Sequence, residues 1–457
     1  MSERSFSPRA LSSPATGLAS HEIGYPCDPP QVQRVLTGEV ISSRLEASMI
    51  TPDMSADGSN ELIFSDAPRL VYWELTRACD LACKHCRAEA VARRDRRELS
   101  TTEATALLEE LQGFGYPPPQ LVMTGGDPLK RPDFFELVRH GVALGIPVSI
   151  APSGTPLLTR EAIAALAASG VKSISLSIDG STAETHDRFR GVAGCFGATL
   201  KAARCVTEEA IPLQVNTLVT AETVGELPGV FRLLLELGII RWSLFYLIGT
   251  GRGRDLREVR PSQCEMLHHW MYDLSKTAPF AIKATEAPHL RRVVYMRMRE
   301  EGLDAAAIRL TAVGKGFGIR DGNGIMFISH IGEVFPSGFL PAAAGNVRQQ
   351  TPVEIYRRSN IFTRIRDVER YAGKCGRCEF RWICGGSRAR AFASSGDLLG
   401  SDPLCPYVPE SLAGGLEAQG LRVISGLQGR EQLQNLGNGL AIQRSLCSEG
   451  SKAVPTV

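Results

Sequence analysis

From Arg69 onward, short strands rich in β-branched residues alternate with helical stretches. This alternation is typical of βα units on a parallel sheet, and so of the α/β class. Strands are expected near residues 69–76, 119–124, 147–151, 172–178, 212–219 and 240–246. Helices are expected near residues 101–113, 132–144, 160–169, 195–208 and 223–237, and again after 261. Six units are too few for a closed eight-stranded barrel, but the loops after the strands should still build the functional site.

Three cysteines follow the first expected strand. Cys79, Cys83 and Cys86 have the spacing C-x3-C-x2-C. Four-iron clusters normally take four thiolates, so a trio with no nearby fourth cysteine indicates a cluster with one iron open to another ligand. The alternatives are a zinc knuckle or three unrelated buried thiols. The trio is therefore the first candidate for the catalytic centre.

A second group of cysteines lies near the end of the chain. Its members are Cys375, Cys378, Cys384 and Cys405, in the pattern C-x2-C-x5-C-x20-C. Two clusters with metal-ligand spacing in a large chain favour metal binding over disulfides. Four thiolates form a closed set, which suits electron transfer, substrate placement or stability, and a structural zinc fits the spacing as well. The remaining thiols are expected to be buried or incidental: Cys27, Cys195, Cys205, Cys264 and Cys447.

The cysteine trio, followed by Thr124-Gly125-Gly126-Asp127-Pro128, resembles the radical S-adenosylmethionine (SAM) superfamily. The resemblance covers roughly residues 66–410 and implies a partial (β/α)6 TIM-like barrel. It implies a [4Fe-4S] cluster on Cys79, Cys83 and Cys86, whose open iron binds SAM. Reduction of that cluster would cleave SAM to a 5′-deoxyadenosyl radical, which abstracts a hydrogen atom from the substrate.

The glycine motif after the second strand is expected to contact SAM. Gly125 and Gly126 would let the backbone approach the ligand closely, since they lack Cβ atoms. Asp127 could accept hydrogen bonds from the methionine ammonium group. The family usually carries Glu at this place, so Asp127 is a departure that shortens the reach by one methylene group.

Later strand ends offer further expected SAM contacts. Ser177 and Asp179 share one face of the fourth strand and would reach the ribose hydroxyls, although they could also cap the next segment. Arg190 is expected to pair with the SAM carboxylate, because a guanidinium matches a carboxylate bidentately. Asn216 on the fifth strand could hydrogen-bond SAM or satisfy the strand end.

The second cysteine group resembles the SPASM/twitch extension of radical SAM enzymes, which carries auxiliary four-iron clusters. Ser337 stands where many relatives have a cysteine, so one auxiliary [4Fe-4S] cluster is expected. The long C-x20-C gap and the run Phe327-Ile-Ser-His330 look like the haem-biosynthesis branch. That branch includes the iron-coproporphyrin decarboxylase and the haem d-type maturation enzymes. His330 is expected to satisfy backbone at the hairpin end, with an approach to an iron centre as the alternative.

A tetrapyrrole with several carboxylates would need cations at the barrel mouth. The candidates are Arg252, Arg254, Arg291 and Arg292. The other functions left open are a peptide-modifying maturase and, from a different class, a non-catalytic metal-binding scaffold with zinc at the second site. A low-potential donor such as flavodoxin or ferredoxin would supply the electron.

Five regions are expected along the chain. They are a poorly ordered leader (1–65), the partial barrel (66–280), a helical linker (281–319), a small β-hairpin and helix iron–sulfur domain (320–410) and a tail (411–457). The net charge of +2 predicts no general attraction to nucleic acid or membrane. With no secretory signal pattern and no apolar run near 18 residues, a cytoplasmic enzyme is expected.

Overall fold

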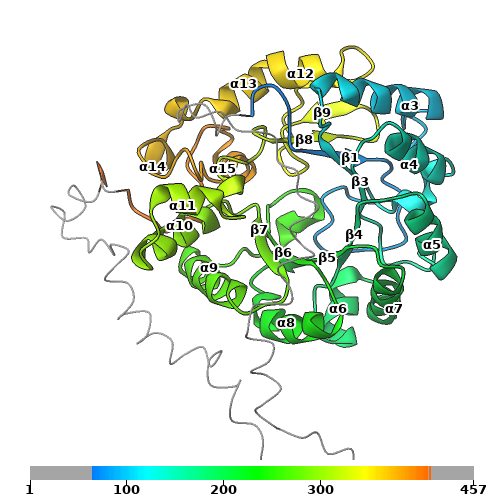
Figure 1. The fold of residues 1–457 in the computed structure, drawn as a ribbon, viewed down its shortest axis with the longest axis horizontal. Helices are drawn as coiled ribbons and strands as arrows, with labels where there is room; N and C mark the ends of the chain where they lie inside the picture. The colour runs from blue at the N-terminus through cyan, green and yellow to red at the C-terminus, as the bar shows by residue number, and fades with distance from the viewer. Residues whose placement is uncertain (1–63, 410, 413–457) are drawn as a thin grey trace, which may run out of the picture. The chain divides into compact units, whose positions relative to one another are not determined.

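The computed structural model describes residues 64–409, 411 and 412 (Figure 1). The expected leader (1–65) and tail (411–457) fall almost wholly outside these residues. No helix in the described part of the chain is long and apolar enough to cross a membrane.

One sheet of ten strands runs through the described residues, in the order β10-β9-β8-β1-β2-β3-β4-β5-β6-β7. The six strands predicted from the sequence are β1 (Leu70–Glu74), β2 (Gln120–Thr124), β3 (Val148–Ile150), β4 (Ser173–Ser177), β5 (Leu213–Val219) and β6 (Arg241–Tyr246). Each pairs in parallel with the next. The predicted α/β class and partial barrel are confirmed.

Helices cover the outer side of the strands (Figure 1). Along the barrel they are α3 (Thr101–Glu110), α4 (Phe134–Ala143), α5 (Arg160–Ala168), α6 (Ala183–Arg190), α7 (Cys195–Glu208), α8 (Leu227–Glu236) and α9 (Pro261–Ser275). All but α6 match predicted helices. A capping box between Ser100 and Glu103 starts α3, because each side chain bonds the other's backbone N–H.

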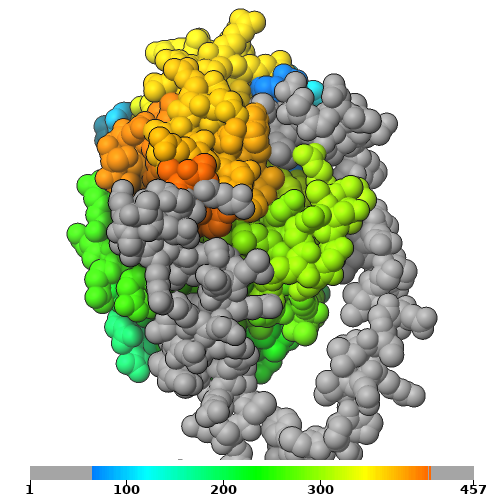
Figure 2. All heavy atoms as spheres, turned by 90° about the vertical axis from the view of Figure 1, so that its left-hand side faces the viewer, coloured from blue at the N-terminus to red at the C-terminus, as the bar shows by residue number. Residues whose placement is uncertain are grey.

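The later elements include strands that extend the barrel sheet at both of its edges. The helices are α10 (Leu290–Glu300), α11 (Ala305–Leu310), α12 (Pro352–Arg358), α13 (Asn360–Arg366), α14 (Gly373–Gly376) and α15 (Arg388–Ser395). The strands are β7 (Ala281–Thr285), β8 (Ile325–Ile328), β9 (Glu333–Phe335) and β10 (Gly345–Asn346). Figure 2 shows the residues beyond about 370, in orange, gathered on one face beside the yellow-green α10 and α11.

Two expectations for this later region need correction. The helical linker expected over 281–319 begins with strand β7, which pairs with β6 in parallel. Its sequence, Ala-Ile-Lys-Ala-Thr, is too weakly β-branched to be recognised as a strand. The predicted hairpin exists as β8 and β9, but β8 pairs with β1 and so extends the barrel sheet. Whether 320–410 forms a separate domain stays a prediction.

Side chains alternate along the strands: apolar ones pack in the core beneath the helices, and polar ones line the lumen of the barrel. Val215 and Trp242 are fully buried in the core between the sheet and its helices. The residues next to them along each strand must face the lumen, since successive strand residues point to opposite faces. The strand register sets four of these in one row: Ser177, Asn216, Ser243 and Lys283.

Candidate active site

The loop after β1 carries the cysteine trio. Cys79 and Cys83 are buried, Cys86 is partly buried, and all three belong to one small cluster with Leu81. The Leu81 N–H lies 3.3 Å from Cys79 Sγ, and the Ala90 N–H lies 3.3 Å from Cys86 Sγ. N–H groups aimed at sulfur stabilise thiolates and help to set the potential of iron–sulfur centres. The trio therefore fits a cluster held by three thiolates.

The glycine motif holds this loop in place. The Gly126 N–H donates to Thr76 O at 2.7 Å, and the Asp127 N–H donates to Ala78 O at 2.7 Å. A Cβ atom at Gly125 or Gly126 would collide with those same carbonyl oxygens. Glycine is thus required here because the backbone of the cysteine loop packs directly against the backbone of Gly125 and Gly126. Contact of Gly125 and Gly126 with SAM stays a prediction.

Asp127 braces the loops after β2 and β3. Its carboxylate is fully buried and accepts from the Leu129 N–H at 3.3 Å and from the Thr155 hydroxyl at 2.6 Å. Burial raises the pKa of Asp127. Both oxygens have partners within the protein, so this arrangement gives no support to the predicted contact with the methionine ammonium group.

Ser153, which the sequence analysis missed, lies beside the first thiol. Its hydroxyl donates to Gly126 O at 2.7 Å and lies 3.4 Å from Cys79 Sγ. The signal that could have revealed it is its position directly after β3, at the site-building end of the strand. Ser153 therefore links the glycine motif to the cysteine loop.

A buried ion pair lies on the other side of the trio. Arg190 Nη2 lies 2.5 Å from Asp179 Oδ2, and Arg190 Nη1 lies 3.6 Å from Cys83 Sγ. Burial alone would raise the pKa of Asp179, but the Arg190 charge lowers it. Asp179 Oδ1 also accepts from the Leu218 N–H at 2.7 Å. Both Asp179 oxygens are engaged, so its predicted ribose contact has no support in this arrangement.

Arg190 retains one free donor. Its Nε is buried and has no hydrogen-bond partner among the described residues. An unpaired buried donor beside the cysteine trio is a natural partner for an anionic ligand group. Pairing of Arg190 with the SAM carboxylate therefore stays a prediction that the geometry favours.

His85 and Arg252 also lie next to the cysteine trio. His85 stacks on Phe189, with ring centroids 5.0 Å apart. Burial, with the Arg190 charge, lowers the pKa of His85 to about 4, so the ring is neutral near pH 7. Arg252 donates from Nε to Cys83 O at 2.9 Å. Arg252 therefore stabilises the cysteine loop through Nε. Its buried Nη2 has no hydrogen-bond partner among the described residues, so its contact with a substrate carboxylate stays a prediction.

His330 makes a side-chain contact where backbone contacts were expected. Its Nδ1 lies 2.8 Å from Glu74 Oε1, and Arg87 lies 2.5 Å from Glu74 Oε2. Burial alone would raise the pKa of Glu74, but Arg87 and His330 lower it to about 2. The hairpin end is thus fixed to the end of β1, close to the start of the cysteine loop.

Cations gather in the lumen beside the row of polar side chains. Enclosure by the protein, together with the positive charges of Arg241 and Arg291, lowers the pKa of Lys283 to about 8. None of these three cations forms an ion pair within the described residues. The Asn216 side chain, expected to bond SAM or to satisfy the strand end, accepts from the Gln214 side-chain amide at 2.7 Å, and its contact with SAM stays a prediction. The lumen therefore offers unneutralised positive charge.

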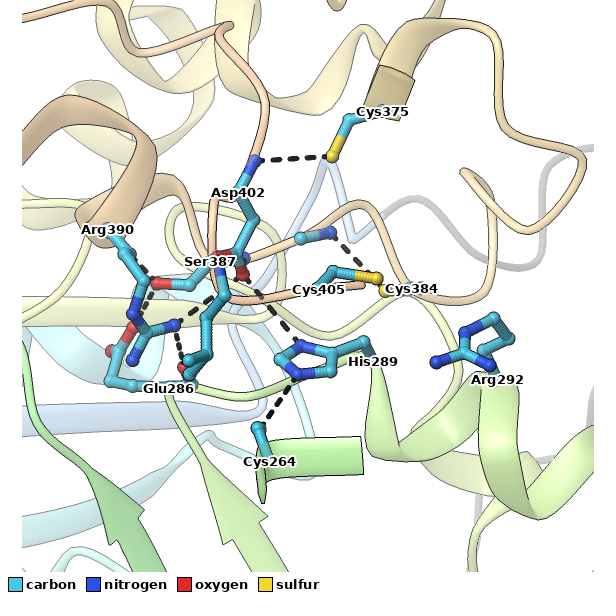
Figure 3. A network of polar contacts seen from close by, with 12 residues as sticks. Cys264, Glu286, His289, Arg292, Cys375, Cys384, Ser387, Arg390, Asp402 and Cys405 are labelled. Carbon is cyan, nitrogen blue, oxygen red and sulfur yellow. Dashed lines mark hydrogen bonds and ion pairs between the residues drawn. The ribbon is translucent and has the colours of Figure 1, made fainter. Parts of the chain in front are cut away.

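The second cysteine set lines a single pocket. Its members are Cys375, Cys378, Cys384 and Cys405, and Arg292 and Lys374 lie at the same pocket. The Asp402 N–H lies 3.4 Å from Cys375 Sγ (Figure 3), and the Gly386 N–H lies 3.4 Å from Cys384 Sγ. Arg292, expected at the barrel mouth, pairs with Glu265 instead.

The spacing of these four sulfurs bears on the choice of metal. All four lie in the described part of the chain, and no three of them fall within 4.8 Å of one another. A single tetrahedral zinc, with Zn–S bonds of about 2.3 Å, would hold sulfurs about 3.8 Å apart. The four sulfurs are therefore spread more widely here than a single zinc would hold them.

Polar contacts join this second set to the barrel (Figure 3). Arg390 donates to Glu286 O at 2.6 Å and lies 3.5 Å from Asp402. The Ser387 hydroxyl donates to Glu286 Oε2 at 2.6 Å. Glu286, just after β7, has a φ of 60°, a strained conformation for this residue type that these contacts hold in place.

Comparison with known proteins identifies the family. A family model described as the radical SAM superfamily matches residues 73–234. The AdoMet-dependent heme synthase of Methanosarcina barkeri is 40% identical over 348 residues, which are 76% of this chain and 99% of that protein. The Fe-coproporphyrin III synthase of the same organism is 31% identical over 370 residues, covering 78% of this chain and 92% of that protein.

A solved structure has the same fold. Streptococcus suis SuiB bound to S-adenosylmethionine matches with a TM-score of 0.60 at 18% identity, over 75% of this chain and 78% of SuiB. Family membership implies a [4Fe-4S] cluster and SAM. The chain therefore belongs to the radical SAM superfamily, in the branch that contains enzymes of haem biosynthesis.

Proposed function

We propose that this protein decarboxylates propionate side chains of an iron-bearing tetrapyrrole, with iron-coproporphyrin as the first candidate and haem as the product. The relatives that match most of its length are named heme synthase and Fe-coproporphyrin III synthase. When bound, the cluster and SAM supply a 5′-deoxyadenosyl radical that removes a hydrogen atom from the substrate.

The chain's own residues would position these groups. Cys79, Cys83 and Cys86 would hold the SAM-binding cluster, with N–H donors on two of the three sulfurs. Arg190 would orient the SAM carboxylate through its unpaired Nε. The neutral His85, stacked on Phe189, would exclude water from this side of the site.

The observation that carries the choice of substrate is the cationic lumen. Lys283 and Arg291 bring positive charge to the inside of the barrel without a paired carboxylate among the described residues. Lys283 is exposed to solvent inside the barrel and is available to a ligand, and the buried Nη1 of Arg291 has no hydrogen-bond partner among the described residues. The lumen therefore favours an anionic ligand. The negative charges of the several propionates of a tetrapyrrole would neutralise these cations.

The second cysteine set would hold an auxiliary [4Fe-4S] cluster. Conversion of a propionate to a vinyl group removes one hydrogen atom, carbon dioxide and one electron, so the reaction needs an electron acceptor. A closed set of four thiolates suits electron transfer better than ligand exchange. A flavodoxin or ferredoxin would deliver the electron that starts the reaction.

The test is turnover under anaerobic conditions with SAM, a strong reductant and iron-coproporphyrin. Mass spectrometry should find a product that has lost carbon dioxide and two hydrogen atoms per propionate, together with 5′-deoxyadenosine. Formation of 5′-deoxyadenosine with an unchanged tetrapyrrole would refute the substrate and direct the search to peptides. Absence of SAM cleavage would leave the metal-binding scaffold as the better interpretation.

A variant tests the lumen directly. Lys283→Met removes one unpaired cation from the polar row, so we expect KM for the tetrapyrrole to rise about tenfold or more, the equivalent of one charged hydrogen bond. SAM cleavage without substrate should not change. The matched control is Lys201→Met on the exposed side of α7. Equal KM values for the two variants would contradict a carboxylate site in the lumen.

A further inference from the structure

A buried group of three metal-binding side chains lies apart from both cysteine sets. Among the described residues, Cys264, His268 and His289 have ligand atoms that all fall within 4.8 Å of one another. Cys264 Sγ lies 3.7 Å from His268 Nε2 and 3.2 Å from His289 Nε2. All three side chains are buried completely. The sequence analysis expected Cys264 to be a buried or incidental thiol, and it is buried.

The fold brings these residues together from two segments. Cys264 and His268 are four residues apart in α9, so they lie on the same face of the helix. His289 comes from the connection between β7 and α10, where it occupies the N-cap position of α10. In Figure 3 the His289 ring lies between Cys264 and Asp402. The site therefore joins a barrel helix to the segment that leads into the later region.

The distances match a tetrahedral zinc site. With Zn–S of about 2.3 Å and Zn–N of about 2.0–2.1 Å, the sulfur and each nitrogen would be about 3.5 Å apart. The two observed separations, 3.7 Å and 3.2 Å, bracket this value. Ordinary packing of a thiol against two rings does not require that all three ligand atoms point to one place.

The surroundings also suit a metal. His289 Nδ1 lies 3.8 Å from Asp402 Oδ2 and has no hydrogen-bond partner among the described residues, so a carboxylate stands beside the second ring nitrogen, where zinc sites commonly hold one. Burial lowers the pKa of His268 and of His289 well below the usual range, so both rings are neutral and able to coordinate. Arg390 lies 3.5 Å from the same Asp402 oxygen, so the negative charge nearest to a bound ion would come from the Cys264 thiolate.

We propose that Cys264, His268 and His289 bind a structural zinc ion. The Tyr246 hydroxyl lies beside Cys264 and donates to Met271 Sδ at 3.6 Å, so it would have to turn from Met271 to take the fourth position of a closed site. Asp402 contacts His289 through its carboxylate and Cys375 through its backbone N–H. The zinc thus stabilises the junction between the barrel and the loop of the second cysteine set.

The test is zinc and iron analysis of the full-length protein after anaerobic reconstitution and dialysis, with X-ray absorption at the zinc edge. We expect about one zinc per chain, bound by one sulfur and three nitrogen or oxygen atoms. A zinc bound by four sulfurs would place the metal in the second cysteine set and overturn the proposal. A protein that keeps its iron and binds no zinc would also overturn it.

Variants assign the ligands. Cys264→Ser and His289→Gln should each lose the zinc while the iron content stays unchanged. Cys205→Ser removes another buried thiol, from α7, and should keep the zinc. If a ligand variant fails to fold, the zinc-edge spectrum of the unmodified protein still shows whether zinc is bound by one sulfur or by four. Full zinc retention in both ligand variants would refute the assignment. None of these results depends on the substrate, so they are independent of the proposed function.

Discussion

The contact between the glycine motif and the cysteine loop gives the sharpest prediction. In Gly126→Ala, the new Cβ would lie 2.7 Å from Arg77 O and 2.8 Å from Ala78 C, whereas ordinary contact begins at 3.4 Å. The added Cβ would come closer still to Ala78 O, and all of these neighbours are backbone atoms, so the loop itself must retreat by about 0.7 Å or more. Overpacking of this kind costs about 1–3 kcal/mol. It also weakens the two 2.7 Å hydrogen bonds that hold the loop.

The expected result is selective loss of the SAM-binding cluster. The cysteine loop shifts while the second cysteine set, on other elements, stays in place. Reconstituted Gly126→Ala should therefore keep about four of eight irons, and the reduced protein should lose the paramagnetic resonance signal that responds to SAM. Urea unfolding should show a stability loss of about 1–3 kcal/mol.

Gly197→Ala is the matched control. Gly197 lies in α7 with no atom within 4 Å of an added Cβ, so alanine should stabilise the helix by about 0.5–1 kcal/mol. Full iron content and unchanged stability in Gly126→Ala would refute the reasoning, because they would mean that the two loops do not touch as described.

Three further predictions concern the same site. The Arg87 charge helps to lower the pKa of Glu74 from 4.5 to about 2. The ionised Glu74 therefore stabilises the fold above pH 4.5, and this contribution is lost as the pH falls towards 2. Glu74→Gln should remove roughly 3 kcal/mol of this pH dependence in denaturant unfolding. Cys83→Ala should abolish SAM cleavage, whereas Cys384→Ala should spare some cleavage but form no product; equal loss in both would mean that the second site is needed for the fold. Ser153→Ala, which removes the hydroxyl between Gly126 O and Cys79 Sγ, should shift the cluster's reduction potential in redox titration, and an unchanged potential would contradict that contact.

Local sequence patterns predicted the barrel well. The six strands and their helices appear within a few residues of their expected positions, because β-branched runs and helical periodicity act over short stretches. Strand β7 was missed, because Ala281–Thr285 shows little of that pattern and gains its place by pairing with β6. Likewise, nothing local indicated that β8 would pair with β1, some 250 residues earlier.

The candidate site was predicted in part. The spacing of Cys79, Cys83 and Cys86 places three thiols in one loop, so the sequence alone was sufficient to locate them. The partners of polar side chains were harder to predict. Asp179 and Arg190 were expected to contact different parts of SAM, yet they face each other at 2.5 Å.

The sequence by itself determined the class of fold, the order of its units and the two cysteine sets, because each depends on residues close together in the chain. Only the tertiary structure decided which charges are paired and which remain free. Asp179 pairs with Arg190 beside the cysteine trio, whereas Lys283 has no anionic partner among the described residues. It also brought His289 to Cys264. The physical reason is that the partner of a side chain depends on which distant segments of the chain come into contact, and short-range sequence patterns carry no information about those contacts.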